Sequence, residues 1–258
     1  MRITVLGSGT SQGVPAIGCD CAVCTSSDPK DKRTRPSVYI EGEGAAILVD
    51  TSTDLRMQAL ANRIRRVDAI LFTHTHADHV MGLDDVRRFN QMQKGAIACY
   101  GDAGTVANVR KMFSYVFDPP MQIGGGLPEL VLHTIDGPLT LGGGLRVIPV
   151  PLWHGALPIL GYRIGSFAYL TDCNRIPDES WRLLTADGGV RVIILDALRH
   201  RPHSTHFSLG EAVDVARRLG VERAYYTHIS HDLAHAETNA QLPAGNELAY
   251  DGLIVETD

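Results

Sequence analysis

The sequence predicts a mixed α/β (α+β) fold with strands and helices distributed along the whole chain. Short apolar, β-branched runs that suit strands recur from the first residues to the last third of the sequence. Segments with a helical spacing of apolar residues lie between several of these runs. The composition, 44% hydrophobic and 21% charged residues, is that of an ordinary globular domain. Interspersed strand and helix signals favour layers in which helices cover a sheet.

The elements follow in chain order, and each predicted strand is a short apolar run between turn-forming residues. The last predicted helix has the clearest limits, because Ser208 and Glu211 can form a capping box and Gly220 can end the helix. Residues 118–144 are rich in Gly and Pro and are predicted to form loops and hairpins. We expect strands at residues 3–6, 38–40, 47–49, 69–72, 147–150, 162–164, 168–170, 192–195 and 224–226. We expect helices at residues 55–65, 84–92, 105–113, 178–184 and 209–219.

The chain is predicted to form one domain, residues 1–258, because no linker-like, low-complexity or repeated segment interrupts the pattern. It carries 24 Lys and Arg against 29 Asp and Glu, a net charge of -5. This balance disfavours nucleic-acid binding, which relies on a basic surface. No run of 18 apolar residues is present, which excludes a transmembrane helix. The first residues read as a strand rather than a signal peptide, so we expect a cytoplasmic protein.

The strongest functional pattern follows the predicted strand 69–72 and reads His74-x-His76-x-Asp78-His79. Side chains two residues apart in an extended segment share a face, so His74 and His76 can bind one ion. If the chain then turns, Asp78 and His79 point toward a neighbouring position. Imidazole and carboxylate groups are the ligands that suit zinc, manganese or iron. The pattern therefore predicts a metal site at a strand end.

A second metal pattern is a cluster of cysteines near the N-terminus. Of the five cysteines, Cys19, Cys21 and Cys24 fall within six residues. An odd number and a tight cluster argue against a disulfide framework and favour a metal site. Three thiolates can bind one tetrahedral zinc, and a structural site needs a fourth ligand. Cys99 and Cys173 are expected to stay free.

The histidine motif resembles the signature of the metallo-β-lactamase superfamily. The resemblance extends along the chain, because His154, Asp172 and His228 follow predicted strands in the order of the family's later metal ligands. It implies an αββα sandwich of two mixed sheets flanked by helices. It also implies two divalent metals, zinc or manganese, at the strand ends. His154 then completes the first site with His74 and His76, Asp172 bridges the two ions, and His228 is the last ligand of the second.

The cysteine cluster, together with residues 13–18 before it, resembles the phosphoribosyl 1,2-cyclic phosphate phosphodiesterase (PhnP-like) family. The resemblance implies that His231, three residues after His228, completes a structural zinc site in a loop of about residues 13–36. It also implies a phosphodiesterase that hydrolyses a small, cyclic phosphodiester such as phosphoribosyl 1,2-cyclic phosphate. A hydroxide that bridges the two metals would attack the phosphorus. Asp78 would both bind the second metal and orient the nucleophile.

Three further residues are candidates for supporting or catalytic roles. Asp50 follows the strand 47–49 and resembles the family's first acidic position, and Asp196 follows the strand 192–195. Each can hold the second ring nitrogen of a site histidine. His206 corresponds to the family's catalytic histidine, which protonates a leaving oxygen or stabilises phosphoryl charge. His200 and His203, in the same segment, are expected to be solvated loop residues.

Two alternative functions stay open. A tRNA 3′-end nuclease uses the same ligand positions, although the negative charge and the lack of an RNA-binding insertion disfavour it. A protein resembling the PqqB family of quinone-cofactor biosynthesis also carries a cysteine zinc motif and need not be a hydrolase. The expected partner is a small-molecule phosphodiester, with no nucleic acid and no membrane. A monomer and a homodimer are both compatible with the sequence.

Overall fold

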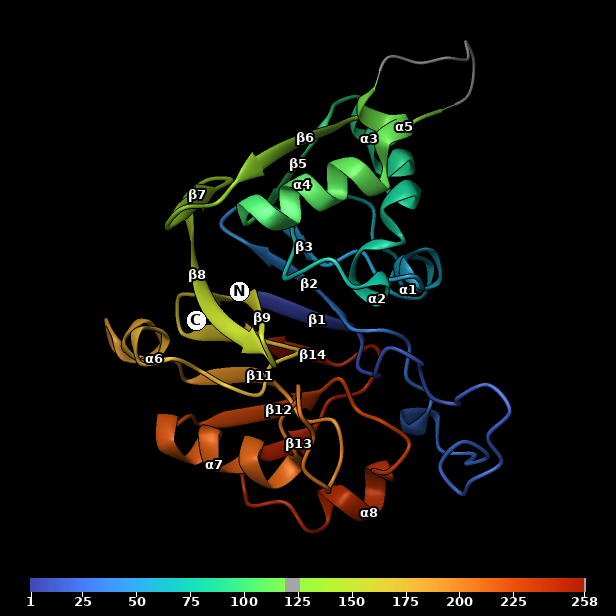
Figure 1. Cartoon of the computed structure of the whole chain (residues 1–258), viewed down its shortest axis with the longest axis vertical. Coiled ribbons are helices and arrows are strands. Elements are labelled where there is room, and N and C mark those ends of the chain that lie inside the picture. Colours follow the sequence, from blue (N-terminus) through green and yellow to red (C-terminus); the bar gives the residue numbers. More distant parts are fainter. Residues whose placement is uncertain (119–125, 258) are drawn as a thin grey trace.

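A computed structural model describes residues 1–118 and 126–257 of the chain. Among these residues, the strands form two mixed sheets of seven strands each. The two sheets lie in the middle of the molecule, and helices cover their outer faces (Figure 1). The layers are therefore helix, sheet, sheet and helix, as the sequence predicts.

The first sheet contains most strands of the N-terminal half, and its order is β14-β1-β2-β3-β4-β5-β6. Strands β1 to β3 are antiparallel neighbours, whereas β3 to β6 run parallel to one another. The bounds are β1 Arg2–Gly7, β2 Ser37–Gly42, β3 Ala45–Val49, β4 Ala69–Leu71, β5 Ile97–Gly101, β6 Leu130–Thr134 and β14 Ile254–Glu256.

The second sheet contains the later strands, and its order is β13-β12-β11-β10-β9-β8-β7. Strands β7 to β10 form an antiparallel meander, and β10 to β13 run parallel. The bounds are β7 Leu139–Leu141, β8 Leu145–His154, β9 Leu157–Ile164, β10 Phe167–Leu170, β11 Val192–Asp196, β12 Arg223–Thr227 and β13 Asn246–Leu248.

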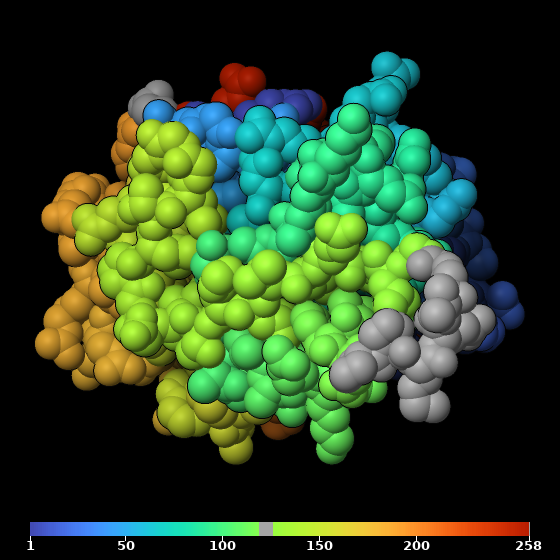
Figure 2. Space-filling model, turned by 90° about the horizontal axis from the view of Figure 1, so that it is seen from above, coloured from blue at the N-terminus to red at the C-terminus, as the bar shows by residue number. Residues whose placement is uncertain are grey.

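The helices divide between the two outer faces. Helices α1 to α5 lie on the side of the first sheet, and α6 to α8 lie on the side of the second (Figure 1). Seen from above, the middle of the chain forms most of the visible surface, with the segment around α6 at its left edge (Figure 2). The bounds are α1 Leu55–Ala61, α2 Ala77–Val80, α3 Arg87–Gln93, α4 Ala103–Met112, α5 Ser114–Phe117, α6 Asp178–Thr185, α7 Leu209–Leu219 and α8 His235–Asn239, with 3₁₀ turns η1 Pro29–Asp31 and η2 Leu83–Val86.

Alternation along the strands builds the layers. In β3, Ile47 and Val49 join the apolar cluster between the sheets, whereas Ala46 and Leu48 pack on the helices outside. Successive strand side chains point to opposite faces, so a strand that is apolar throughout is buried on both sides. A third apolar cluster lies between the second sheet and α6 and α7.

The predicted elements and the observed ones differ mainly at the sheet edges. The four edge strands, β14, β6, β13 and β7, were not predicted, and neither was β5. The edge strands are short and partly exposed. β7, β13 and β14 have only three residues each, and β6, although it contains three consecutive apolar residues, lies in the segment expected to form loops and hairpins. In the segment 118–144, β7 and β8 form a predicted hairpin, but β6 pairs parallel with β5. Residues 119–125 of that segment lie outside the described residues.

Two helices also differ from prediction. The helix expected at 55–65 ends at Ala61, because Arg63 has a left-handed backbone with a φ of 54°. The helix expected at 84–92 begins as the 3₁₀ turn η2 and becomes α3. Within the described residues, no helix combines the length and the apolar character needed to cross a membrane.

Candidate metal centres

The predicted active-site ligands come together at one edge of the two sheets. Parallel strands bring their carboxyl ends to the same edge, so residues that follow different strands can meet there. Each candidate residue comes at or soon after the end of a strand: Asp50 after β3, His74 to His79 after β4, His154 on β8, Asp172 after β10, Asp196 on β11 and His228 after β12.

A first group consists of His74, His76 and His154, whose ring nitrogens lie within 4.8 Å of one another. The Nε2 atom of His74 is 2.9 Å from Nδ1 of His76. The ring of His154 lies 5.6 Å from that of His74 and 5.1 Å from that of His76, centroid to centroid. His74 and His154 are buried, and His76 is exposed. The predicted shared face of His74 and His76 is therefore present.

A second group consists of Asp78, His79, Asp172 and His228, all buried. The Nε2 atom of His79 is 3.3 Å from a carboxylate oxygen of Asp78 and 3.2 Å from one of Asp172. The Nε2 atom of His228 is 3.2 Å from the other Asp172 oxygen. Asp172 also lies 4.0 Å from Nε2 of His74, so its carboxylate stands between the two groups.

The protonation of Asp172, His74 and His154 suits metal ligands. Burial by itself would raise the pKa of Asp172, but the adjacent His228 and His79 lower it well below its usual range. Burial also lowers the pKa of His74 and of His154, which keeps both rings neutral near pH 7. Neutral imidazoles and ionised carboxylates are the forms that bind divalent metals. His79 differs: burial by itself would lower its pKa, but the charges of Asp172, Asp50 and Asp78 raise it well above its usual value.

Neighbouring groups fix the ring orientation of the candidate ligands. His79 donates from Nδ1 to Asp50 at 2.7 Å, and Thr73 donates to both Asp50 oxygens, from its backbone N–H and its hydroxyl. His154 donates from Nδ1 to the backbone oxygen of Thr205 at 2.8 Å. Such contacts leave the Nε2 lone pairs free to bind a metal.

The fit to a metal is supported by buried nitrogens that lack hydrogen bonds. Within the described part of the chain, Nε2 of His79 and Nε2 of His228 have no hydrogen-bond partner. An unpaired buried polar group is costly, so several around one point indicate a missing shared partner. A divalent cation satisfies imidazole nitrogens and carboxylate oxygens together.

His206 lies beside the second group and is held by Asp196. The Nδ1 atom of His206 is 3.1 Å from Asp196 Oδ1, and the backbone N–H of Phe207 donates to Asp196 Oδ2. The ring of His206 stacks on that of His228, with centroids 4.5 Å apart. Burial lowers the pKa of His206. The structure thus shows the predicted contact between Asp196 and a site histidine.

Backbone conformation is unusual at three residues of this centre. Asp50, Asp172 and His228 have φ angles of 61°, 56° and 60°, in the left-handed region. Residues other than glycine adopt this region at a cost of order 1 kcal/mol or more, and such residues cluster at functional sites. Asp50 and His228 directly follow strands β3 and β12, and Asp172 follows β10 after one residue, so each left-handed residue lies where the chain leaves the sheet edge.

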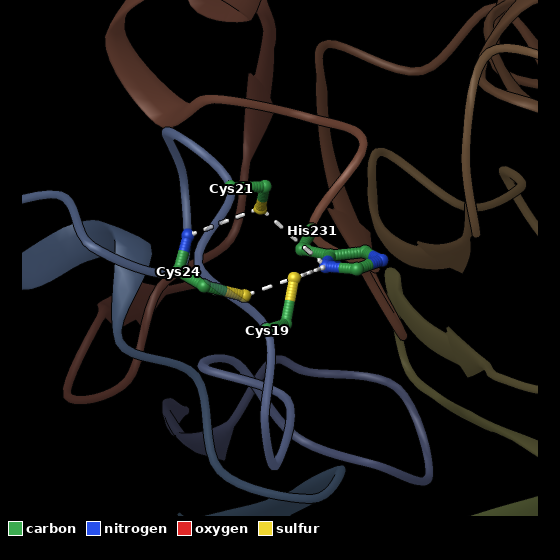
Figure 3. A group of neighbouring side chains, drawn as sticks. All are labelled: Cys19, Cys21, Cys24 and His231. Atoms are coloured by element: carbon green, nitrogen blue, oxygen red, sulfur yellow. Dashed lines mark hydrogen bonds between the residues drawn. The ribbon is translucent and has the colours of Figure 1, made fainter.

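The predicted cysteine site is assembled from both ends of the chain (Figure 3). The sulfur atoms of Cys19, Cys21 and Cys24 lie 3.2, 3.6 and 3.3 Å from Nδ1 of His231. A tetrahedral zinc with ordinary bond lengths requires sulfur–nitrogen separations of roughly 3.5 Å. The hydrogen bond from the Cys24 backbone N–H lowers the pKa of Cys21 to about 7. The donor set and its spacing therefore fit a closed zinc site.

Arg33 joins the loop that carries these cysteines to the segment around His231. Its side chain is fully buried and donates to the backbone oxygens of Ser230 and Leu233 at 3.0 and 2.7 Å. It also forms an ion pair of 3.0 Å with the buried Asp31. A buried charge needs such partners, so these contacts hold the two segments together.

Sequence reasoning located the candidate ligands but missed parts of their surroundings. The hydroxyl of Thr73 and the backbone oxygen of Thr205 act on ligand rings, and no residue pattern identifies such contacts. His203 was expected to be solvated, yet it is half-buried, and its ring lies 5.2 Å from that of His206. His200 is exposed as expected, and Cys99 and Cys173 are buried free thiols outside both groups.

The chain is similar in sequence to a family model, a solved structure and several curated proteins. A family model described as a β-lactamase superfamily domain matches residues 45–229. A crystal structure described as a new diphosphatase from the PhnP family is 47% identical, with a TM-score of 0.91, and the match covers 100% of this chain and 98% of that one. An octanoyltransferase from Porphyromonas gingivalis is 40% identical over 256 residues, which cover 98% of this chain. A coenzyme PQQ synthesis protein B from Methylorubrum populi is 34% identical over 101 residues.

The curated relatives are matched over only part of their length. This chain spans 51% of the octanoyltransferase, about half of that protein. The match to the PQQ synthesis protein covers 34% of this chain and 34% of the relative.

Proposed function

Because this chain belongs to the metallo-β-lactamase superfamily and resembles its PhnP family, we propose that it is a metal-dependent phosphodiesterase. Its proposed substrate is a small phosphodiester, such as the cyclic diester of phosphoribosyl 1,2-cyclic phosphate. One observation carries this proposal: the Asp172 carboxylate stands between two groups of ligand side chains. Two metals held close together are typical of enzymes that hydrolyse phosphate esters.

The two groups would hold two divalent ions, zinc or manganese. His74, His76 and His154 would bind the first ion, and Asp78, His79 and His228 would bind the second, with Asp172 shared. When bound, such ions supply Lewis acidity toward the phosphoryl oxygens and lower the pKa of water toward neutrality. Asp50 and Thr205 keep the ligand rings in place through their Nδ1 atoms.

His206 supplies the proton on the leaving side. Asp196 holds its Nδ1 atom, which leaves Nε2 to carry the proton that moves to the departing oxygen. Burial lowers the pKa of His206 and raises that of Asp196, so the imidazolium form that this transfer requires depends on the nearby charges of Asp172 and Asp78, which raise the pKa of His206. Asp78, which is buried next to His79 and His228, would bind the second ion and orient the nucleophile.

A second substrate class is a diphosphate, since the PhnP-family neighbour at 47% identity is described as a diphosphatase. The octanoyltransferase name belongs to a protein of which this chain spans half, and the metal groups described here support hydrolysis. A net charge of -5 disfavours the tRNA nuclease alternative, and the PQQ synthesis relative aligns with about a third of the chain.

Turnover of defined substrates by metal-reconstituted protein tests the proposal. We expect hydrolysis of a cyclic or linear small phosphodiester, or of a diphosphate, well above that of the metal ions alone. Cleavage of only a tRNA precursor would favour the nuclease. No cleavage of any phosphate ester would favour a role without hydrolysis.

We further propose a structural zinc bound by Cys19, Cys21, Cys24 and His231. Fully loaded protein should then contain about three divalent ions per chain, and mild chelation should leave about one. The retained ion is the structural zinc, because a closed tetrahedral site has no exchangeable water. Elemental analysis before and after dialysis against a chelator measures both numbers. Complete loss of zinc under mild chelation would contradict the structural site.

Replacing Cys21 with serine should lower both the zinc content and the stability. Metal binding at a structural site contributes directly to folding, so we expect a loss of roughly 3 kcal/mol or more. For a chain of this size that loss lowers Tm by roughly 6–12 °C. Asp20→Asn, at an exposed position in the same loop, is the matched control and should match wild type. A Cys21→Ser protein with wild-type Tm and zinc content would remove the zinc proposal.

A further inference from the structure

The loop of residues 199–206, between β11 and α7, contains a side chain that the proposed mechanism does not use. The loop is held at its base, where the Leu198 N–H donates to the Phe207 oxygen at 3.0 Å. The rings of His228, His206 and His203 follow one another, with centroids 4.5 and 5.2 Å apart. The first two are buried and His203 is half-buried, so His203 is the next ring outward from the metal ligands.

The hydrogen bonds of His203 define which nitrogen carries its proton. The backbone N–H of Thr205 donates to Nδ1 of His203 at 3.3 Å, and the Thr205 hydroxyl lies 3.2 Å from the same atom. A backbone N–H can only donate, so Nδ1 is an acceptor and the proton of the neutral ring is on Nε2. None of the described residues accepts a hydrogen bond from Nε2. His203 therefore offers a free N–H donor beside His206.

The positive charge of Arg199, in the same loop, acts on His203. The guanidinium of Arg199 donates to the backbone oxygens of Arg201 and Pro202, at 3.3 and 3.1 Å, and so braces the turn that carries His203. Within the described residues, Arg199 has no carboxylate partner. Burial lowers the pKa of His203, and the charge of Arg199 acts in the same direction on both His203 and His206. The environment therefore favours an anionic oxygen as the acceptor.

We propose that His203 is a specificity residue that donates from Nε2 to an anionic leaving group, with the charge of Arg199 reinforcing the contact. This inference rests on the proposed function and, of the two substrate classes proposed there, favours the diphosphate. A diphosphate offers a second phosphoryl group on the leaving side, whereas the leaving oxygen of a ribose cyclic phosphate belongs to an uncharged sugar. The site then prefers a phosphoanhydride to a simple phosphodiester.

The reaction is hydrolysis of a P–O–P linkage into two phosphate monoesters. The oxygen of one water forms a bond to the phosphorus at the metal ligands, and the anhydride P–O bond breaks. The electron pair of that bond stays on the oxygen of the departing phosphate, which lies against His203. One proton of the water passes to solvent or to a phosphate oxygen, so no oxidant or further reactant is needed.

Two substrates that share the same phosphoryl group but differ in the leaving group test whether His203 contacts the leaving group or only stabilises the site. UDP-glucose releases a sugar phosphate, whereas uridine 5′-(p-nitrophenyl) phosphate releases a phenolate without a phosphate. We expect His203→Phe to lower the ratio of kcat/KM between the first and the second substrate by about 10- to 100-fold, mainly through KM. His203→Gln, whose side-chain amide N–H can replace Nε2–H, should recover part of that ratio. An equal loss on both substrates would overturn the proposal.

Binding of substrate analogues tests the same contact without turnover. Metal-loaded protein should bind methylenediphosphonate at least about 10-fold more tightly than methylphosphonate by calorimetry, and His203→Phe should lose this preference. His200→Phe is the matched control, since His200 is exposed in the same loop and should leave the preference unchanged. No preference in wild type would overturn the inference even if the protein hydrolyses phosphodiesters. A preference that depends on His203, in a protein that hydrolyses nothing, would support this contact and contradict the proposed function.

Discussion

Replacing Asp172 is expected to lower the rate of hydrolysis by about 10³-fold or more while the fold persists. Its carboxylate lies 3.2 Å from the Nε2 atoms of both His79 and His228, and 4.0 Å from that of His74. On the proposed function, loss of this shared ligand would affect both ions, so the effect should exceed the 10- to 100-fold cost of removing a group that only supports a ligand. Steady-state turnover and metal content of Asp172→Asn and Asp172→Ala measure it.

Two variants distinguish loss of the Asp172 ligand from loss of the fold. Asparagine tolerates the left-handed backbone of Asp172 (φ 56°) better than alanine does, so Asp172→Asn should keep a Tm near that of wild type. Asp50→Asn is the graded control, because Asp50 contacts His79 at Nδ1 and should cost only about 10- to 100-fold. Wild-type activity in Asp172→Asn and Asp172→Ala would mean that Asp172 is not a shared ligand.

The second large effect concerns His206 and depends on the leaving group. We expect His206→Ala to lower hydrolysis of an alkyl cyclic phosphate by roughly 10²–10⁴-fold, the usual contribution of a general acid. The effect on bis(p-nitrophenyl) phosphate should be much smaller, because nitrophenolate departs without protonation. Metal content should not change. Rates on the two substrates, with metal analysis, measure the difference.

The control for this experiment is His200→Ala, which removes an exposed histidine from the same loop. His203 is unsuitable as a control because its ring lies 5.2 Å from that of His206. Equal losses on both substrates would show that His206 binds phosphate or positions the site instead of acting as an acid. An unchanged rate on both substrates would show that His206 has no role in hydrolysis.

Local patterns in the sequence predict local structure well in this chain. The capping box of Ser208 and Glu211 and the left-handed Gly220 are present, and α7 has the predicted bounds. The spacing of His74 and His76 likewise predicts their contact. In each case the interacting groups lie within a few residues, so propensity and spacing determine the outcome.

Contacts between distant segments are not readable in the same way. The bond from His154 to the oxygen of Thr205 joins residues 51 apart, and its acceptor is a backbone atom. The proximity of His203 to His206 depends on the path of the loop at Pro202, where the Arg199 side chain donates to the backbone oxygens of Arg201 and Pro202. Most of the edge strands were missed because they have three residues each and are partly exposed, whereas β6 was missed because its surroundings are rich in Gly and Pro.

The left-handed backbone at Asp50, Asp172 and His228 places stability and chemistry in conflict at the same three positions. Glycine occupies this region without the steric penalty of a Cβ atom, so selection for a robust fold alone would favour glycine at all three. The chain instead carries a carboxylate, a carboxylate and an imidazole there. Metal-free Asp172→Gly should therefore resist denaturant better than metal-free Asp172→Ala, although neither retains the ligand. On the proposed function, these three positions keep metal-binding side chains at a cost in stability.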